Sequence, residues 1–462
     1  MNKIIIKQEF SIKTPEELDK LTHEELLKYI KNLQKRLVKE KPKKNSNNSS
    51  IAPSTDMTKP KKNQTLRESS GRKTGGQKGR VGKTLTQTEN PDNVVELDFN
   101  IENCKNCNTS LADIEKELKE RRQVLDLELS QLDTQITEYQ SFSKICPLCG
   151  FENHDNAFPT LVAPHISYGV NITAIVSYLS VSHYVSYNRI VSIMSNLFKV
   201  KLSEGVVDRM IKKSSALSEK EIEKITENLE LSSILGIDET GCKIDGQKYW
   251  HWTFQDDKNT LIVANKSRGT KVIDENFENG FVNACVVHDN YSSYNSLISN
   301  KEQLCLAHKL RDLNYAIECD DTQVMKDLKL LIKESMIDHK ENFTLTQRKI
   351  LKQEYEHSLE YLLNQEAIPK SETQKQLNSF IKAHEKNQIF TFLEHPNIPS
   401  DNNGSERAIR NVKVKLKVSG QFKSFQGAKD YASLRSIIDT SRKRGLNEFD
   451  SLVGIISENS VF

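Results

Sequence analysis

The chain has 462 residues, 36% of them hydrophobic and 28% charged, with a formal net charge of +3 at pH 7. This length predicts about two to four domains, with ample apolar residues for a core. The sequence argues against a membrane span, because no apolar run reaches the roughly 18 residues that a span requires. The three isoleucines near the N-terminus are too few for a signal peptide. We therefore expect a cytoplasmic protein, in which paired cysteines more often bind metal than form disulfides.

Residues 1–40 have the pattern of a helix. Thr14 is suited to cap its N-terminus, with Pro15 in the first helical position and Glu17 completing a capping box. Apolar residues then recur with 4-3-4 spacing, as in a coiled-coil seam: Leu26, Ile30, Leu33 and Leu37. Only about three heptads are available, so a short self-associating coiled coil and a single packed amphipathic helix are both open.

Residues 41–92 are expected to form a basic, disordered linker. Gly, Ser, Asn, Pro and Lys abound and apolar residues are scarce, so no core can form there. Between Lys41 and Lys83 there are 12 Lys or Arg residues against two acidic ones, a local net charge of +10. A basic arm on a nearly neutral protein suits a polyanion. Four residues set among glycines favour phosphate or minor-groove contact: Arg72, Lys73, Lys78 and Arg80.

Residues 93–155 contain two Cys-x-x-Cys turns, separated by 38 residues. The first turn pairs Cys104 with Cys107, and the second pairs Cys146 with Cys149. Four thiolates in two such turns suit a tetrahedral structural zinc ion. The alternating segments QVLDLEL and TQITEYQSF are predicted strands that could bring the turns together. Unliganded thiols or a redox pair are the alternatives.

Residues 156–230 have a helical pattern. ITAIVSYLSVSHYVSYNRIVSIMSNLF is apolar on one broad face, and KLSEGVVDRMIKK has the length and polarity of half a helix-turn-helix. We expect a helical domain that binds DNA or connects its neighbours.

At residue 231 the apolar pattern changes to that of strands. SSILGIDET is predicted to be a strand ending at Asp238, KYWHWTFQ and TLIVAN an antiparallel hairpin, and NACVVHDNYSSY a strand ending at Asp289. EQLCLAHKLRDLNYAIE is predicted to be a strand followed by a helix. A mixed sheet with acidic residues at neighbouring strand ends is what a ribonuclease-H-like domain needs. We assign this domain to residues 231–462 of a multidomain α+β protein.

Three further side chains near these strands are assigned structural roles. His288, beside Asp289, is expected to be structural, with tuning of the site as the alternative. Trp250 and Trp252 alternate with His251 and Thr253, so one face of this strand is expected to be core. Base stacking by the tryptophans is the less favoured interpretation.

The last part of the chain adds charged helices and a final acidic motif. Residues of about 320–399 are expected to form a helical insertion in the catalytic domain. SDNNGSERAIR then starts a helix near Asp401 that places four charged residues on one face: Glu406, Arg410, Lys413 and Lys417. A strand after Asn411 is the alternative, because VKVKLKV alternates. Taken alone, Glu406 is typical of a capped helix with a surface Glu–Arg pair.

The carboxylates suggest metal-dependent chemistry. Asp238 or Asp289 alone could simply cap a turn. Together they supply the residue type needed for two-metal phosphoryl transfer, in which carboxylates from different elements converge on Mg²⁺ ions about 3.5–4 Å apart. Such hard cations prefer oxygen ligands. Two aspartates are usually insufficient, and Glu406 can complete the site.

At these residues the sequence resembles the insertion sequence 66 family, a family of aspartate-aspartate-glutamate transposases. The similar stretches follow the same order over nearly the whole chain: NSNNSSIAPS, SGRKTGGQKG, the cysteine turns, LGIDET, VVHDNYSSY, LCLAHKLRDL, SDNNGSERAIR and FQGAKDYASLRSIIDTSRKRGLNEFDSL. The resemblance implies that Asp238, Asp289 and Glu406 are the catalytic triad. It also implies a zinc-binding module at the four cysteines.

The expected activity is that of a DNA transposase, which cleaves insertion-sequence ends and joins the 3′-hydroxyl to target DNA. Two Mg²⁺ ions would bridge the three carboxylates. Four basic residues of the last motif are expected to contact phosphates: Arg407, Arg410, Lys413 and Lys417.

The expected partners are double-stranded DNA of the transposon ends and target, and further copies of the chain in an oligomer on DNA. Small accessory proteins of the same element are an additional option, and the place of action would be the nucleoid of a bacterial cytoplasm. Two alternatives remain. The first is a structure-selective nuclease of the same fold that hydrolyses without joining, and the second is an inactive, zinc-containing DNA-binding regulator.

Overall fold

The computed structural model of the chain describes residues 168–462 without interruption. N-terminal to these it describes only short pieces: Leu18, 20–30, 42–45, 47–49, 89–90, Ser110, 143–145, Cys149 and 152–154.

A short capped helix lies in the N-terminal region, where residues 23–30 are helical. Its capping box is formed by Thr22 and Glu25. The Glu25 carboxylate accepts a hydrogen bond from the Thr22 backbone N–H at 3.0 Å, and the Glu25 N–H donates to Thr22 Oγ1 at 3.4 Å. The cap predicted at Thr14 and the later part of the predicted seam lie outside the described residues.

The region of the cysteine turns is described only in part. Strands β1 (Ser143–Ile145) and β2 (Glu152–His154) pair antiparallel. Cys149 lies in the connection between them, with an exposed free thiol. The other three cysteines of the two turns lie outside the described residues, so zinc binding stays a prediction.

The predicted helical region is confirmed from Val170 onward. It consists of four helices: α3 (Val170–Val181), α4 (Tyr187–Leu197), α5 (Glu204–Leu217) and α6 (Glu219–Glu230). Ser203 caps α5, because its hydroxyl accepts a hydrogen bond from the Val206 N–H at 3.3 Å. Apolar side chains of α3, α4 and α5 share one core with the C-terminal helices.

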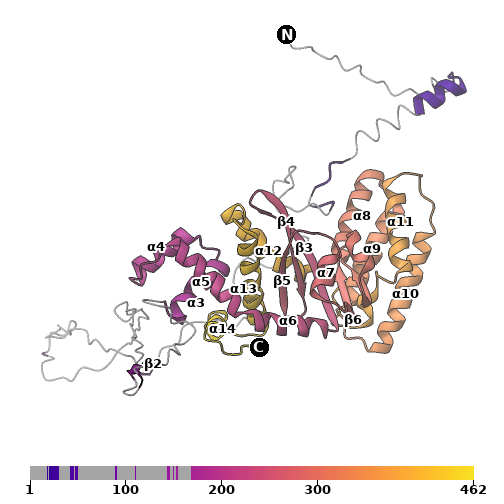
Figure 1. Cartoon of the computed structure of the whole chain (residues 1–462). Coiled ribbons are helices and arrows are strands. Elements are labelled where there is room, and N and C mark those ends of the chain that lie inside the picture. The colour runs from indigo at the N-terminus through magenta and orange to yellow at the C-terminus, as the bar shows by residue number, and fades with distance from the viewer. Residues whose placement is uncertain are drawn as a thin grey trace, which may run out of the picture.

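The centre of the molecule is a five-stranded mixed sheet in the order β5-β4-β3-β6-β7 (Figure 1). Its strands are β3 (Ile234–Ile244), β4 (Gln247–Gln255), β5 (Thr260–Asn265), β6 (Phe281–His288) and β7 (Ser299–Leu304). The first three strands pair antiparallel, whereas β6 and β7 continue the sheet in parallel pairing. Helix α7 (Lys271–Asn276) belongs to the crossover from β5 to β6, and the 3₁₀ turn η2 (Ser292–Ser296) lies between β6 and β7. The predicted mixed α+β architecture is thus confirmed.

One strand boundary was predicted wrongly. Strand β3 does not end at Asp238 but continues to Ile244. Its parallel pairing with β6 stops at Gly236, whereas its antiparallel pairing with β4 continues through the rest of the strand. Asp238 therefore lies just beyond the parallel pairing with β6, in the part of β3 that continues to pair with β4.

Both faces of the second half of β4 are buried, whereas its alternation predicts one core face. His251 faces Phe422 and Tyr431 on one side, with ring centroids 5.3 and 6.5 Å away. Trp252 stacks on Phe254 on the other side, at 6.3 Å. Strand β4 is therefore covered on both faces, and Trp252 belongs to the core.

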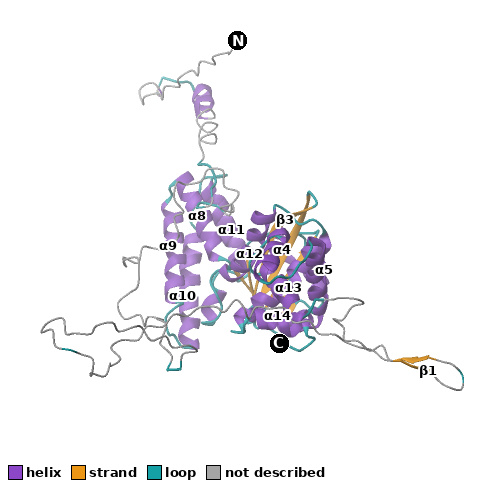
Figure 2. Cartoon of the chain, turned by 90° about the vertical axis from the view of Figure 1, so that its left-hand side faces the viewer, coloured by secondary structure: helices purple, strands orange, loops and turns teal. Residues whose placement is uncertain are grey.

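The predicted helical insertion is also confirmed. It consists of α9 (Gln323–Asp338), α10 (Leu345–Leu363), α11 (Glu372–Glu385) and the 3₁₀ turn η3 (Thr391–Glu394), and it follows α8 (Leu306–Asp320), the helix predicted after β7. These helices share their own apolar core, which reaches the β6–β7 edge of the sheet through Cys285 and Leu304. Figure 2 shows them as a bundle beside the domain that holds the sheet.

The C-terminal helices are α12 (Asn403–Ser419), α13 (Phe425–Lys443) and α14 (Glu448–Ile456). Helices α12 and α13 cover the face of the sheet opposite α7, whereas α14 packs against α3 and α13. The predicted helix after Asp401 is confirmed, and the alternative strand after Asn411 does not form. Ile409 and Val412 are buried, so their apolar stripe holds this segment as a helix. No described helix is long and apolar enough to cross a membrane.

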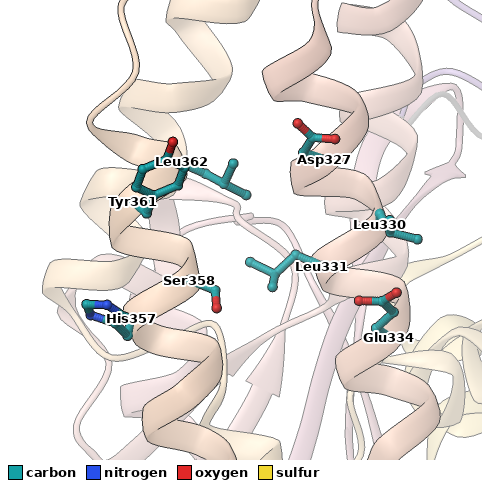
Figure 3. A pocket seen from close by; sticks show the side chains of 8 residues that line it. All are labelled: Asp327, Leu330, Leu331, Glu334, His357, Ser358, Tyr361 and Leu362. Atoms are coloured by element: carbon teal, nitrogen blue, oxygen red, sulfur yellow. The ribbon is translucent and has the colours of Figure 1, made fainter.

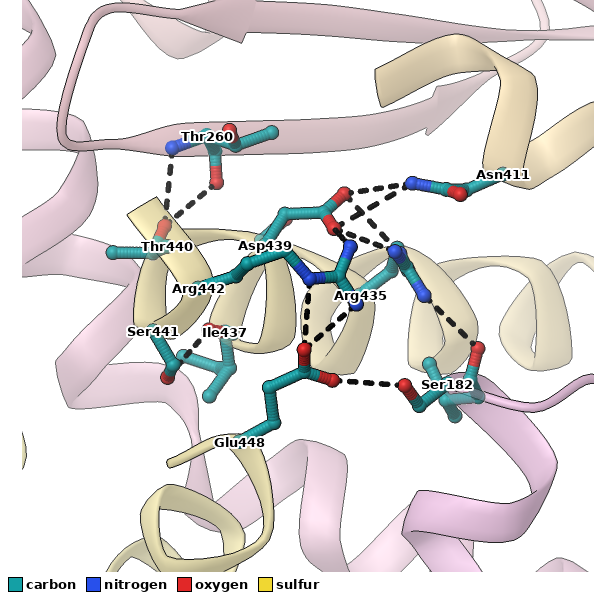
Figure 4. A network of polar contacts seen from close by, with 12 residues as sticks. Ser182, Thr260, Asn411, Arg435, Ile437, Asp439, Thr440, Ser441, Arg442 and Glu448 are labelled. Carbon is teal, nitrogen blue, oxygen red and sulfur yellow. Dashed lines mark hydrogen bonds and ion pairs between the residues drawn. The ribbon is translucent and has the colours of Figure 1, made fainter. Parts of the chain in front are cut away.

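A polar network fastens α12, α13 and α14 to α3 (Figure 4). Arg435 is 1% exposed and forms a two-point contact with Asp439, at 2.6 and 3.1 Å. The same carboxylate accepts a hydrogen bond from Asn411 of α12 at 3.2 Å. At the end of α3, the Ser182 hydroxyl donates to Glu448 of α14 at 2.9 Å. These contacts fix the direction in which α12 crosses the sheet.

Candidate active site

The three predicted carboxylates come from three elements that meet where the parallel pairing of β3 with β6 ends. Asp238 lies on β3, Asp289 directly follows β6, and Glu406 is in the first turn of α12. The last parallel pair of β3 with β6 joins Gly236 to Val287. Each aspartate is two residues beyond its member of that pair, so the two lie at corresponding positions on adjacent strands.

The start of α12 is fixed to β3 and α8 by hydrogen bonds from the SDNNGSER stretch. The Asn402 side chain donates to the carbonyl of Ile237, the residue before Asp238, at 2.6 Å. The Asn402 backbone N–H donates to Cys305 Sγ at 3.2 Å, and the Leu306 N–H donates to the Ser400 carbonyl at 2.9 Å. These bonds place the first turn of α12, with Glu406, beside β3.

Two glycines permit this close approach. A Cβ atom at Gly404 would lie 2.6 Å from Gln255 Nε2, and one at Gly236 would lie 2.6 Å from Ser405 Oγ. A larger residue at either position would force Gln255, Ser405 or the helix itself to move, because real Cβ atoms essentially never come so close to another heavy atom.

The site concentrates negative charge. The pKa of Asp238 is held well above its ordinary value, first by burial and then by the charges of Glu239, Asp289 and Glu406. Among the described residues, neither Asp238 nor Asp289 forms an ion pair with Lys or Arg. Perturbed carboxylates of this kind are typical of functional sites.

Glu239, which the sequence analysis missed, is the one acidic neighbour with a cation of its own. Its side chain is 1% exposed and lies 2.6 Å from Arg268 Nη2. Burial raises the pKa of Glu239, while a hydrogen bond from the Tyr294 hydroxyl and the pairing with Arg268 act in the opposite direction. Arg268 comes from the loop after β5, and no local pattern in the sequence marks it.

Two aromatic rings hold the Arg268 guanidinium in place. Its carbon atom lies 3.6 Å from the centroid of the Tyr291 ring and 4.6 Å from that of Trp250. Trp250 is thus engaged as a cation–π partner, and Lys248 also lies over it, at 4.7 Å. These contacts give Trp250 a supporting role beside the site.

A cavity of about 280 Å³ adjoins the carboxylates. It is lined by the turn after β6 and by the start of α8: Asp289, Asn290, Tyr291, Leu304, Cys305, His308, Lys309 and Asp312. His308 Nε2 lies 3.8 Å from Glu406 Oε1. Burial, and next the charge of Arg311, lower the pKa of His308, whereas Glu406 and Asp289 act in the opposite direction. His308 lies in the LCLAHKLRDL stretch of the resemblance, where no local pattern marks it.

Lys309 contributes a second perturbed group to this cavity. Burial lowers its pKa to about 8, and its Nζ donates to Ser379 on α11 at 2.8 Å. This buried contact joins α8 to the helical insertion.

His288 has a structural role, as the sequence favoured. It is 3% exposed, its Nε2 lies 3.1 Å from Glu302 on β7, and its ring packs against Tyr294 at 4.7 Å. Its Nδ1 contacts the carbonyl of Asp289. These contacts hold the turn that carries Asp289.

The structure describes four of the eight basic residues that were predicted to bind DNA. Arg407, Arg410 and Lys417 are exposed on α12, and Lys413 is partly exposed. Glu406 lies near His308, and within the described residues it forms no ion pair with Arg410. The arginines are thus available for another anion, and the four basic residues of the arm at 72–80 lie outside the described residues.

The carboxylates as they stand do not form a finished metal site. Within the described parts of the chain, no three His, Cys, Asp or Glu side chains lie close enough together to hold a metal ion. The donor set nevertheless suits a hard divalent cation, because Asp238 carries repulsion from three neighbouring carboxylates that such a cation would relieve. Holding one would require the carboxylates to move closer together.

A second cavity, of about 360 Å³, lies between α9 and α10 (Figure 3). Its lining mixes apolar and acidic side chains: Asp327, Leu330, Leu331, Glu334, His357, Ser358, Tyr361 and Leu362. None of these residues comes from the elements that carry the three carboxylates, so we assign the candidate site to the smaller cavity.

Two family models match the chain. The model of the Transposase IS66 family matches residues 165–430, which include all three carboxylates. A family of unknown function (DUF6444) matches residues 7–86. No curated protein is significantly similar to the chain.

Proposed function

Because the chain belongs to the Transposase IS66 family, we propose that it cleaves the ends of an insertion sequence and joins the resulting 3′-hydroxyl to target DNA. Asp238, Asp289 and Glu406 are the proposed catalytic carboxylates. Two Mg²⁺ ions, when bound by these residues, would supply charge stabilisation at the phosphate and activation of the attacking hydroxyl. The observation that carries the proposal is the placement of the carboxylates: Asp238 and Asp289 lie two residues beyond the last parallel pair of β3 with β6, and a hydrogen bond from Asn402 to β3 brings in the first turn of α12, with Glu406. The raised pKa of Asp238, caused first by burial and then by the neighbouring carboxylates, is consistent with this placement.

The residues around the carboxylates have proposed supporting roles. Glu406 is positioned by the start of α12, and Arg407 and Arg410 on the same helix would bind flanking phosphates through their planar guanidinium groups. Lys413 and Lys417 would extend this contact along the helix. His308, 3.8 Å from Glu406, would orient that carboxylate.

The modular organisation is proposed with the same boundaries as above. The ribonuclease-H-like domain would span residues 231–462, supported by the sheet in which antiparallel β5-β4-β3 continues into parallel β6-β7. A helical connecting domain, a zinc module at 93–155, a basic arm at 41–92 and an N-terminal helix would precede it. Metal analysis of the purified protein tests the zinc module, which one bound zinc per chain would support and zinc-free protein would refute.

The activity can be tested with purified protein, Mg²⁺, a labelled duplex carrying the end of the element and a supercoiled target plasmid. We expect a nick at the element's end, followed by transfer of the label to the plasmid. An unrelated duplex of equal length serves as the control and should be neither nicked nor joined.

The same assay separates the two other candidates. A structure-selective nuclease would cut the duplex but leave the plasmid unlabelled. A DNA-binding regulator would retard the duplex in a gel without cutting it. Either outcome would contradict the proposed strand transfer.

A further inference from the structure

A polar segment near the N-terminus is buried against the catalytic domain. Residues 42–45 and 47–49, here called the strap, belong to a stretch whose composition predicted a solvated linker. Asn48 is nevertheless only 1% exposed and Ser49 5% exposed. Buried polar side chains are stable only when their hydrogen bonds are made. The hydrogen-bond partners of the strap therefore indicate whether it binds at a defined position on the domain.

The strap is internally structured by its asparagines. Asn45 Oδ1 accepts hydrogen bonds from the N–H groups of Asn47 and Asn48, at 2.8 and 3.2 Å. In return, Asn48 Oδ1 accepts from the Asn45 N–H at 2.7 Å, and the Ser49 hydroxyl donates to the Asn45 carbonyl at 2.6 Å. Side chains thus satisfy the backbone in place of a helix or sheet, as in Asx turns.

The strap is seated on one face of α8. Asn48 Nδ2 donates to Glu318 Oε2 at 2.6 Å, and the ammonium of Lys44 lies 4.8 Å from the ring centroid of Tyr315. Asn314, one residue before Tyr315, donates to the Asn47 carbonyl at 3.5 Å. These contacts join residues about 270 positions apart in the chain, and Figure 1 shows the indigo strap beside α8.

The same helix lines the catalytic cavity. His308, Lys309 and Asp312 of α8 face this cavity together with Asp289. Burial raises the pKa of Asp312, and the nearby positive charges of Lys309, His308 and Lys44 of the strap act in the opposite direction. The strap therefore approaches the cavity that adjoins the catalytic carboxylates.

We propose that α8 is a docking site for the strap, and that docking fixes the point at which the basic arm at residues 51–92 leaves the catalytic domain, next to the catalytic cavity. Because the arm follows the strap directly in the chain, docking would tether the arginines and lysines of the arm to the domain that holds the carboxylates, which would raise their effective concentration for DNA bound there. The part of this proposal that concerns DNA rests on the proposed transposase function, whereas docking of the strap does not.

The test uses the full-length chain and reverses one hydrogen bond. In Asn48→Asp, a carboxylate replaces the amide that donates to Glu318, so two negative charges oppose each other. The acceptor that Asn48 offers to the Asn45 N–H is retained. Adding Glu318→Gln restores the bond with its direction reversed, because the new amide can donate. Glu318→Gln alone is the matched control, since its amide oxygen still accepts from Asn48.

The first measurement is amide hydrogen exchange of residues 42–49, which needs neither DNA nor activity. We expect Asn48→Asp to accelerate exchange at least tenfold and the control to exchange like the wild type. The double variant should recover most of the protection, because of the two bonds that Asn48 Nδ2 donates only the weaker one, to the Lys43 carbonyl at 3.3 Å, stays lost. Equal exchange in Asn48→Asp and the wild type would overturn the docking site.

The second measurement is the dissociation constant of a labelled duplex, with the cleavage rate of the preformed complex measured alongside. Asn48→Asp should weaken binding about tenfold and leave the rate in the complex unchanged, with recovery in the double variant. Faster exchange without weaker binding would overturn the positioning of the arm. A wild-type chain that binds the duplex but does not cleave it would instead contradict the proposed transposase. The exchange and binding measurements would still test whether the strap docks and positions the arm.

Discussion

At the scale of single residues, Asp238 is the position where the proposed function opposes stability. Its carboxylate is surrounded by Glu239, Asp289 and Glu406, and its pKa is raised by burial and by these charges. Such an arrangement costs the metal-free protein folding free energy, as functional sites often do. A carboxylate in such surroundings is expected to bind a cation, because the positive charge would offset the repulsion from the neighbouring carboxylates.

We predict that Asp238→Asn abolishes cleavage and stabilises the metal-free protein by about 0.5–2 kcal/mol. The amide removes the charge that its neighbours repel. Denaturant unfolding at pH 7 without divalent ions measures the effect, and Asp257→Asn in the exposed β4–β5 turn is the control. Full cleavage activity, or a loss of stability, in Asp238→Asn would contradict the prediction.

The same carboxyl predicts a pH dependence. Because its folded-state pKa is raised, the folded state holds more protons than the unfolded state above pH of about 4. Its contribution to stability is therefore fully present below that pH and is lost as the pH rises through the raised pKa. Asp238→Asn should gain most, relative to the wild type, at the upper end of this window, as unfolding at a series of pH values would show.

Arg268 contributes to stability through its ion pair with the buried carboxylate of Glu239. We predict that Arg268→Ala lowers the free energy of unfolding by about 2–4 kcal/mol, because it leaves a buried carboxylate without its cation. The value lies below that of a fully buried pair, since the Arg268 side chain is 35% exposed. Adding Glu239→Gln should recover part of the loss in urea unfolding. A loss below about 0.5 kcal/mol would mean that the pair contributes no more than an ordinary surface pair.

At the scale of elements, the site depends on how closely α12 approaches β3. The Asn402 side chain bonds the carbonyl before Asp238, and the glycines at 236 and 404 leave room for Gln255 and Ser405. The network around Arg435 and Asp439 then fixes the rest of α12.

We predict that Gly404→Ala costs about 1–3 kcal/mol through overpacking and lowers cleavage by displacing Glu406. The new methyl group would meet Gln255, which Lys443 holds at 2.7 Å. Gly205→Ala is the matched control, because its nearest neighbours are 3.9 Å away and alanine is the better helix former. Equal stability of the two variants would show that α12 can shift at no cost.

The elements themselves were largely predictable, because their apolar periodicity is local. Strands β3 to β7, the helical insertion and α12 all follow from it. The end of β3 was not predictable from the sequence, because pairing with β4 extends the strand beyond Asp238. Arg268 and the strap were missed for a related reason, since their partners lie far away in the sequence and no local pattern marks them.

At the scale of the whole molecule, charge is distributed as the proposed action on DNA requires. The net charge is only +3, yet the arm is strongly basic and the site strongly acidic. An acidic centre repels DNA on its own, so basic groups elsewhere in the chain must hold the phosphates near it.

We predict that replacing the four basic residues of the arm by Gln lowers the slope of log affinity against log salt by up to about 3–4, because each phosphate contact contributes about 0.9. These residues are Arg72, Lys73, Lys78 and Arg80. The control replaces four exposed lysines of the helical insertion: Lys333, Lys349, Lys370 and Lys382. Equal slopes in the two variants would show that the arm touches no phosphates.

The central claim is that three carboxylates from β3, the β6 turn and α12 act together on DNA. Its most direct test is the Mg²⁺-dependent cleavage rate of a labelled element end by Glu406→Gln, with Glu366→Gln at an exposed position as the control. The account predicts a loss of at least a hundredfold for Glu406→Gln and wild-type rates for the control. Cleavage by Glu406→Gln at the wild-type rate would contradict it.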